Sequence, residues 1–129
     1  MLAVSTPNAP KPAGHYAQAV IHDGIVYVSG QLPIDLHTCE PCLGSMDEQT
    51  EQALQNLSEI LKAAGSGLDR VIRTTVYIAD IELWGRVNAV YSRFFGQHRP
   101  ARTVVPTSIL HFGCQVEIDA MAAVDRMAE

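Results

Sequence analysis

The spacing of hydrophobic and polar residues changes along the chain, and the changes predict where the secondary-structure elements lie. Residues 16–30 contain two runs rich in β-branched and aromatic residues, and Asp23-Gly24 between them indicates a two-residue hairpin turn. Residues 1–14 are rich in Pro, Ala and small polar residues, so we expect an extended lead-in. Residues 31–45 mix Pro, Asp, Thr and Gly, which predicts a loop.

Two later segments carry apolar residues at helical spacing. In the first, Ser45 followed by Glu48 predicts a capping box, and Gly65 is a suitable residue just beyond the end of a helix. Its apolar positions are Ala53, Leu54, Leu57, Ile60, Leu61 and Ala64. In the second, we expect Asp80 to be the N-cap and Gly96 to end the helix. Its apolar positions are Ile81, Trp84, Val87, Val90, Tyr91 and Phe94.

Three further segments, residues 70–80, 101–105 and 114–124, read as strands from their β-branched, aromatic and alternating residues. The resulting order is two strands, a helix, a strand, a helix and two strands. This order is typical of an α+β fold in which a single mixed β-sheet carries two helices on one face. Residues 1–129 show no internal repeat and no linker, which predicts a single domain.

Apolar residues are expected on both faces of the predicted sheet. Val76 and Ile78 point to one face while Tyr77 points to the other, and Met121 likewise opposes Ile118 in the last strand. Two helices can cover only one face of a sheet. The second apolar face is therefore expected to be buried by another subunit, which predicts an oligomer.

Composition narrows the classes of function. The chain has 129 residues, of which 47% are hydrophobic and 18% are charged, as in a soluble globular protein. Its formal net charge is −5 and it has no Lys/Arg run, so nucleic acid and anionic membranes are not expected partners. We expect no signal peptide from the N-terminal sequence. Three cysteines do not suggest a disulfide framework, so a reducing, cytoplasmic location is expected.

Arg102 is the first candidate for chemistry, because it begins an apolar strand and has no local counter-ion. No Asp or Glu occurs between Glu82 and Glu117, although the interval contains several arginines. Glu117 alternates with apolar neighbours in the last strand. If the two terminal strands are near each other, Arg102 and Glu117 form either a structural ion pair or a small hydrolytic site. In such a site Arg102 grips a carboxylate and Glu117 exchanges protons with water.

Cys39 and Cys42 form a C-x-x-C motif, with His37 just before it. A structural zinc site normally needs four ligands, and Cys114 and His111 are unforced additional partners. The segment also lacks the strand-then-helix context of a thioredoxin-like redox motif. We therefore predict that these thiols hold no metal. Tyr16, Ser29 and Asn88 are three further candidates for a functional site, although none of them indicates a function on its own.

Taken together, several segments resemble the Rid family, the reactive intermediate deaminases also called the YjgF family. The resemblance covers residues from about 8 to 124, and the Pro-Ala-Arg and Val-Glu-Ile pairing near the C-terminus is its most specific part. The segments are "GHYAQAV", "VYVSGQLP", "EQTEQALQNLSEILKAAGSGLDRVIRTTVYIAD", "VNAVYSRFFGQHRPAR" and "VEIDAMA".

The resemblance implies a chorismate-mutase-like α+β fold and a homotrimer, with a central barrel and with ligand clefts between subunits. It also implies hydrolysis of enamines and imines of 2-amino acids, such as 2-aminoacrylate and 2-iminobutanoate, to 2-keto acids and ammonia, with no cofactor. Arg102 matches the family's carboxylate-binding arginine and Glu117 the glutamate that acts through water. The matching substrate-binding positions in the cleft are Tyr16, Ser29, Gly30, Asn88 and Val104.

The chain also departs from the family's usual pattern. His15 replaces a frequent proline, Val104 a common cysteine, and Asp119 the second acid of a Glu-Ile-Glu sequence, while His111 and Phe112 lie in an altered loop. These changes can reshape the cleft, so the substrate stays open. Two alternatives are a non-catalytic 2-keto acid-binding module and a pathway-specific deaminase, for example of the 2-aminomuconate type. Ribonuclease activity is disfavoured by the acidic balance.

Overall fold

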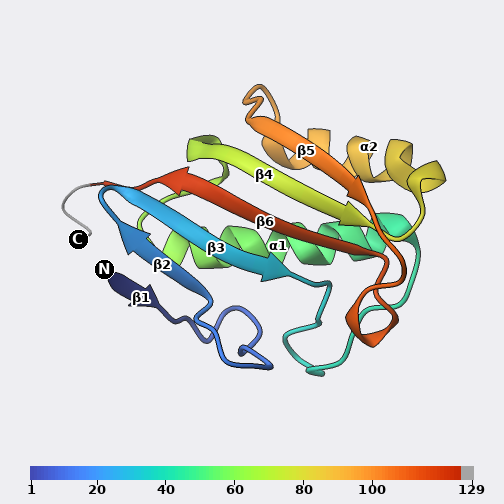
Figure 1. Ribbon diagram of the computed structural model, residues 1–129, viewed down its shortest axis with the longest axis horizontal. Helices are drawn as coiled ribbons and strands as arrows, with labels where there is room; N and C mark the ends of the chain where they lie inside the picture. Colours follow the sequence, from blue (N-terminus) through green and yellow to red (C-terminus); the bar gives the residue numbers. More distant parts are fainter. Residues whose placement is uncertain (126–129) are drawn as a thin grey trace.

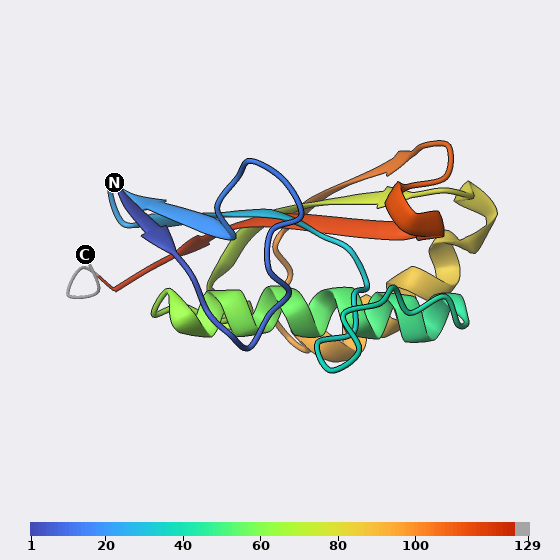
Figure 2. The same ribbon diagram turned by 90° about the horizontal axis from the view of Figure 1, so that it is seen from below.

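The computed structural model describes residues 1–125, which form a six-stranded mixed sheet with two helices on one face (Figures 1 and 2). The strands are β1 (Leu2–Val4), β2 (Ala19–His22), β3 (Ile25–Gln31), β4 (Val71–Ile78), β5 (Ala101–Pro106) and β6 (Val116–Ala123). The helices are α1 (Met46–Ala63) and α2 (Trp84–Phe95), with 3-10 turns η1 (Leu68–Arg70), η2 (Ile81–Leu83) and η3 (His111–Gly113). The predicted α+β class is confirmed.

The sheet order is β1-β2-β3-β6-β4-β5, and only β4 and β5 run parallel within this order. Helix α2 connects that parallel pair, as a crossover between parallel strands requires. The last strand, β6, lies in the middle of the sheet, where it pairs with β3 on one side and β4 on the other (Figure 1). Strands β5 and β6 are therefore separated by β4.

In the N-terminal half one prediction is confirmed, and one strand is present that the sequence did not predict. The hairpin turn is confirmed, because Asp23 and Gly24 both have positive φ, at 50° and 77°, as a type I′ turn requires. The residues expected to be only an extended lead-in include β1, which pairs with β2 in the register Leu2↔Ile21. A three-residue edge strand is too short to show a period in the sequence.

Both ends of α1 follow the prediction. The Ser45 side chain accepts a hydrogen bond from the Glu48 N–H at 3.2 Å. At the other end Gly65 has φ 80°, its N–H donates to the Lys62 carbonyl, and the Ser66 N–H donates to the Leu61 carbonyl. This is a Schellman motif, which satisfies the last carbonyls of the helix.

The predicted start and apolar stripe of α2 need correction. Asp80 caps the 3-10 turn η2, where its carboxylate accepts from the Glu82 N–H at 3.0 Å. A 3-10 turn has about three residues per turn, so it changes the direction of the residues before the α-helix. Ile81 and Trp84 are consequently 46% and 44% exposed. The buried residues of α2 are Val87, Val90, Tyr91 and Phe95.

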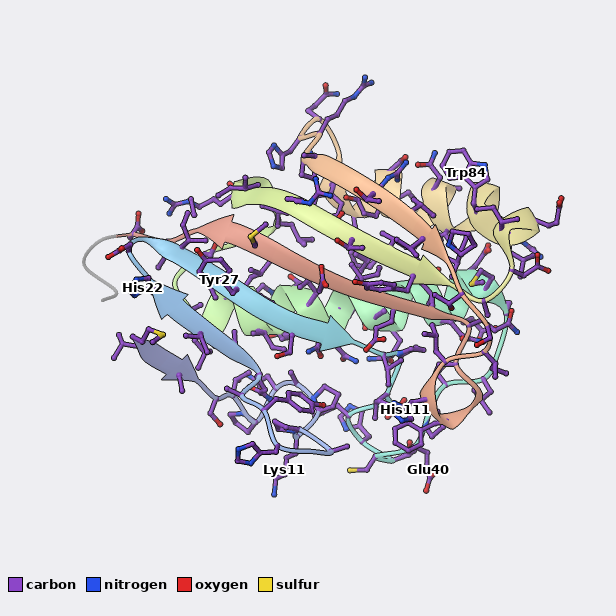
Figure 3. All side chains as sticks on the ribbon, in the orientation of Figure 1. Lys11, His22, Tyr27, Glu40, Trp84 and His111 are labelled. Carbon is purple, nitrogen blue, oxygen red and sulfur yellow. The ribbon has the colours of Figure 1, made fainter. Side chains whose placement is uncertain are left out.

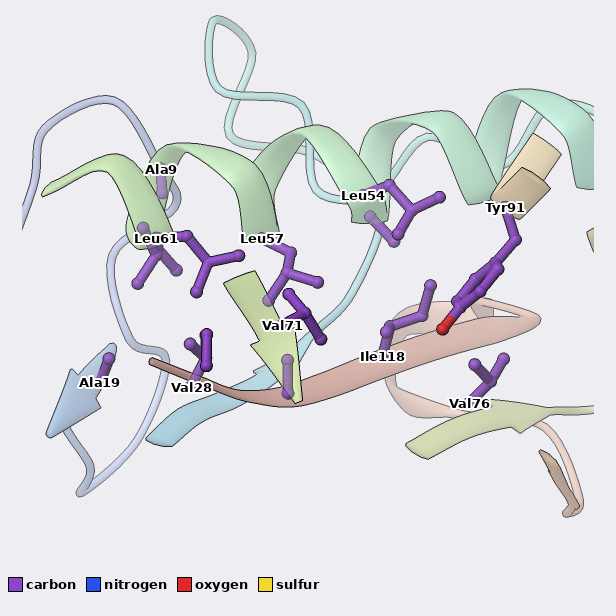
Figure 4. Close-up of a cluster of buried hydrophobic side chains, with 14 of the residues drawn as sticks. Ala9, Ala19, Val28, Leu54, Leu57, Leu61, Val71, Val76, Tyr91 and Ile118 are labelled. Atoms are coloured by element: carbon purple, nitrogen blue, oxygen red, sulfur yellow. The ribbon is translucent and has the colours of Figure 1, made fainter. Parts of the chain in front are cut away.

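The helices bury one face of the sheet in a continuous apolar core (Figure 4). Leu54, Leu57 and Leu61 of α1 pack in this core together with Val76 and Ile118 of the sheet, all almost completely buried. The alternation predicted for β4 and β6 is therefore confirmed on this side. Within residues 1–125, no helix has the length and apolar character needed to cross a membrane.

The opposite sheet face is less apolar than predicted. Tyr27 of β3 is 44% exposed, and Tyr77 and Met121 are half-buried on the same face, so part of this surface is apolar. Glu117 and Asp119 also lie on it, opposite Tyr77 and Thr75 in register. We call this surface, formed by the outward residues of β3, β4 and β6, the open face. The open face thus carries apolar side chains together with two carboxylates.

A buried glutamine ties the long loop of residues 31–45 to the beginning of β6. Gln49 of α1 is only 1% exposed. Its Nε2 donates to the Gly44 carbonyl at 3.1 Å, and its Oε1 accepts from the Gln115 N–H at 2.9 Å. The amide thus satisfies two backbone groups that belong to segments far apart in sequence. Because Glu117 follows Gln115 closely, this contact also fixes the start of the strand that carries Glu117.

We predict that Gln49→Ala lowers the free energy of unfolding by about 1–3 kcal/mol, because it removes two hydrogen bonds to partly buried backbone groups of distant segments. Urea denaturation at a fixed protein concentration measures this loss. Gln55→Ala on the exposed side of α1 is the matched control and should change the value by less than about 0.5 kcal/mol. Equal midpoints for the two variants would contradict the assigned role of Gln49.

Candidate functional site

Arg102 lies on the helix-facing side of β5, and neutral partners hold it there. It is opposite the buried Thr74 in register, and its Nη1 donates to Asn88 Oδ1 of α2 at 2.8 Å. Its Cζ lies 4.8 Å from the centroid of the Tyr91 ring and 5.6 Å from that of Trp84. Both rings are within the range of cation–π attraction. The guanidinium is therefore oriented without any acidic side chain.

The absence of a counter-ion separates Arg102 from Arg93 and Arg70. Arg93 of α2 pairs with Glu51 of α1, with Nη2 2.6 Å from Oε1, and Arg70 pairs with Asp125 at 2.8 Å. In the described part of the chain, Arg102 has no carboxylate within 4.0 Å. Several of its N–H donors remain available for an anionic ligand.

Glu117 lies on the open face of β6. Burial raises the pKa of its carboxyl group, His111 lowers it, and the negative charge of Asp119 raises it, with a net upward shift. Gly30 of β3 packs against this carboxylate, since a Cβ at position 30 would come within 2.6 Å of Glu117 Oε2. The carboxyl group is consequently half-buried against backbone, which keeps its pKa closer to neutrality than that of an exposed glutamate.

The single chain does not bring Arg102 and Glu117 together. The register places Arg102 on the helix-facing side and Glu117 on the open face, and β4 lies between their strands. The ion pair considered from the sequence is therefore absent from the described residues. Because the two side chains point to opposite faces of the sheet, rotation about their side-chain bonds cannot bring them into contact.

The other predicted residues divide between the same two sides. Asn88 contacts Arg102, and half-buried Val104 lies on the same face of β5 as Arg102. Ser29 lies beside Gly30 on β3, and its hydroxyl donates to the Ala17 carbonyl at 2.7 Å. Tyr16 is 51% exposed in the loop before β2. Each chain therefore presents two half-sites, one around Arg102 and one around Glu117.

Of the altered residues, His111 lies close enough to Glu117 for its charge to lower the pKa of that carboxyl group. Figure 3 shows His111 at the edge where β3 ends and β6 begins. Phe112, with φ 61°, is 56% exposed, and its ring centroid lies 5.5 Å from that of His111. His15 is also exposed.

The C-x-x-C motif is not joined to a ligand cluster in the described residues. Cys39 is exposed, Cys42 is half-buried and Cys114 is buried, and all three thiols are free. Burial raises the pKa of the Cys114 thiol, with smaller contributions from Glu117 and Cys42. Within residues 1–125, no group of three or more His, Cys, Asp or Glu side chains could hold a metal ion.

In chemical terms, the two half-sites offer an anion clamp and a proton exchanger. The guanidinium of Arg102 presents a planar set of donors that fits a carboxylate bidentately. The Glu117 carboxyl group has the raised pKa that general acid–base catalysis near neutral pH favours. A small anionic ligand with a bond to hydrolyse is the kind of substrate that these two groups suit.

Sequence matches to known proteins extend over almost the whole length of the chain. The family described as Endoribonuclease L-PSP matches residues 6–124. A RutC family protein of Pyrococcus horikoshii is 42% identical over 119 residues, covering 92% of this chain and 94% of that protein. The 2-iminobutanoate/2-iminopropanoate deaminase of Rattus norvegicus is 43% identical over 119 residues, covering 92% and 87%.

Solved structures give the same picture. The crystal structure of TdcF from E. coli with bound serine has a TM-score of 0.91 and 32% identity, covering 95% of this chain and 98% of that one. RidA from an Antarctic Psychrobacter has a TM-score of 0.92 and 33% identity, covering 96% and 100%.

We predict that Glu117→Gln melts at a higher temperature than the unsubstituted protein at pH 8. A carboxyl group with a raised pKa binds a proton more tightly in the folded state, so stability falls as pH rises from its unfolded pKa through its folded pKa. Glutamine carries no such penalty. Thermal melts should therefore diverge above this window and converge below about pH 4, where the glutamate is protonated in both states.

The matched control is Glu82→Gln, because Glu82 is an exposed acid at the start of η2. It should show no comparable gain at pH 8. A lower melting temperature for Glu117→Gln at pH 8 would mean that the charged Glu117 is a stabilising structural partner, contrary to this interpretation.

Proposed function

The chain belongs to the Endoribonuclease L-PSP family, also called RutC or Rid, and from this premise we propose that it hydrolyses reactive imines and enamines of 2-amino acids. The products are 2-keto acids and ammonia. The observation that carries the proposal is Arg102, a guanidinium oriented by Asn88 and two aromatic rings with no acidic partner in residues 1–125. Relatives about 40% identical are named 2-iminobutanoate/2-iminopropanoate deaminases, which supports the same reaction.

Arg102 holds the carboxylate of the imine in this mechanism. Asn88 Oδ1 accepts from Nη1, which fixes the plane of the guanidinium, and the remaining N–H groups face the ligand. A charge-assisted hydrogen bond of this kind contributes about 1.5–3 kcal/mol. The clamp also places the C=N carbon in one position relative to the water that attacks it.

Glu117 moves the protons. The carboxylate takes a proton from a water molecule as the water oxygen bonds to the imine carbon, and the protonated Glu117 gives this proton to the nitrogen as the C=N π bond breaks. Glu117 then takes the hydroxyl proton of the resulting 2-amino-2-hydroxy acid and passes it to the amino nitrogen, so that ammonia leaves as the C–N bond breaks and the keto group forms. An imine is already electrophilic, so these two side chains can supply the catalysis. An enamine substrate is first protonated at carbon to give the imine.

The opposite orientations of Arg102 and Glu117 imply that two chains build each cleft. We infer a homotrimer in which the open faces line a central barrel and the clefts lie between subunits. Arg102, with Asn88 and Val104, then faces Glu117, Ser29, Gly30 and Tyr16 of a neighbouring chain. Apolar residues of the open face, such as Tyr27 and Met121, support burial of that face by other subunits. The free thiols fit a reducing, cytoplasmic setting.

Two alternative functions, a 2-keto acid-binding module and an endoribonuclease, can be told apart from a deaminase. A 2-keto acid-binding module would use the same Arg102 clamp without turnover, so ammonia release from a fresh imine separates it from a deaminase. The family's description mentions endoribonuclease, yet this chain has a formal net charge of −5, which opposes binding of a polyanion.

We predict that Arg102→Ala lowers kcat/KM for freshly generated 2-iminobutanoate by about 10- to 100-fold, because it removes the charge-assisted bonds to the carboxylate. Arg102→Lys keeps the charge but loses the bidentate fork and should recover only part of this loss. An ammonia-release assay measures both. Arg93→Ala is the control, since Arg93 is exposed and paired with Glu51. Unchanged kcat/KM in Arg102→Ala would exclude the clamp.

We also predict that Gly30→Ala lowers kcat for 2-iminobutanoate by about tenfold or more, because the added methyl group displaces the Glu117 carboxylate. The melting temperature should change little, since the group that must move is the end of a flexible side chain. Gly85→Ala in α2 is the control, because a Cβ at that position meets no atom within 4 Å. Full activity in Gly30→Ala would show that the Glu117 position is not required.

A further inference from the structure

A cavity of about 500 Å³ extends from Arg102 along the C-terminal end of α2. Its walls include Arg99, His98 and Arg102 from the segment that leads into β5, with Asn88, Tyr91 and Ser92 from α2. The cavity therefore includes the Arg102 half-site and continues beyond it. A 2-imino acid held at Arg102 would have space for its side chain in this cavity.

The charged groups that line this cavity are cationic. Arg99 and Arg102 both line it, and no Asp or Glu does, although the chain as a whole has a formal net charge of −5. Neither arginine has a carboxylate within 4.0 Å in the described part of the chain. The nearby Arg93, in contrast, turns toward α1 and pairs with Glu51. Two guanidinium groups without counter-ions favour a ligand with two negative charges.

The backbone geometry allows the two arginines to act on one ligand. Residues 99 and 102 are three positions apart, so their Cα atoms lie at most roughly 10 Å from each other. Pro100 lies between them and precedes β5, and both side chains line the same cavity. His98 helps to fix this wall, since its Nε2 lies 2.6 Å from the Val71 carbonyl oxygen.

We propose that this cavity makes the protein selective for 2-imino acids that carry a second carboxylate on the side chain. Arg102 binds the carboxylate next to the imine carbon, and Arg99 binds the side-chain carboxylate. The inference rests on the proposed deaminase function and adds the substrate class. Because the second carboxylate does not take part in the reaction, Arg99 contributes mainly to KM and has little effect on kcat. Arg99 is thus a specificity-determining residue.

The test compares an imine with one carboxylate and an imine with two. Iminosuccinate and 2-iminobutanoate are generated in place from aspartate and 2-aminobutanoate by amino acid oxidases, and ammonia release is corrected for each oxidase alone. The readout is the ratio of kcat/KM for iminosuccinate to that for 2-iminobutanoate. We expect Arg99→Gln to lower this ratio about tenfold through a higher KM for iminosuccinate. Arg99→Lys should lower it less, and the control Arg93→Gln should leave it unchanged.

Binding without turnover separates a failure of this inference from a failure of the deaminase proposal. Titration calorimetry should show tighter binding of oxaloacetate and 2-oxoglutarate than of 2-oxobutanoate, and Arg99→Gln should remove that preference. The inference alone is overturned if the wild-type protein hydrolyses 2-iminobutanoate but Arg99→Gln changes neither the kcat/KM ratio nor the calorimetric preference for dicarboxylates. Protein that hydrolyses neither imine overturns the deaminase proposal, and the calorimetric preference then decides whether Arg99 recognises the second carboxylate.

Discussion

The alternation of side chains along β-strands is the constraint on which the functional account depends. It directs Arg102 toward α2 and Glu117 toward the open face, so one chain holds the anion clamp and the proton exchanger on opposite sides of its sheet. The guanidinium of Arg102 and the carboxyl group of Glu117 are each positioned by their own neighbours. Asn88 and Tyr91 orient Arg102 without neutralising it, and Gly30 allows backbone to approach Glu117 closely. In the homotrimer that we propose, a surface from a second chain completes the site.

The two faces of the sheet therefore have different tasks. The helix-facing side holds the apolar core around Leu54, Leu57 and Ile118 and supplies most of the stability. The open face carries a half-buried carboxyl group whose pKa is raised by burial, which costs stability at neutral pH. Such a cost is expected at a functional position, because a strictly stabilising sequence would place an uncharged residue there.

Local sequence signals predicted the local structure well. The Asp23-Gly24 turn, the Ser45 cap and the two faces of β4 and β6 were correct, since each depends on a few adjacent residues. The predicted buried face of α2 was wrong at its start, because a 3-10 turn precedes the α-helix and changes the direction of Ile81 and Trp84. Strand β1 was missed because three residues show no period.

The candidate site was harder to predict than the fold. The residue pattern and then the resemblance to the Rid family made Arg102 and Glu117 candidates, but their distance within one chain depends on β4 lying between β5 and β6, which the order of elements does not reveal. The Gln49 link and the cavity shared by Arg99 and Arg102 join segments distant in sequence. No short-range pattern specifies such contacts, and Arg99 gained a role only from the cavity that it lines.

Complementation between two inactive variants is the most direct test of the claim that each site combines Arg102 of one chain with Glu117 of another. Arg102→Ala and Glu117→Gln are purified separately, mixed in equal amounts, unfolded in urea and refolded together. Random assembly into a cyclic trimer gives an intact Arg102–Glu117 pair at about one cleft in four, so roughly a quarter of wild-type imine hydrolysis should return. Refolding each variant alone should leave only the low residual activity of that variant. Mixed trimers no more active than the separate variants would contradict the account.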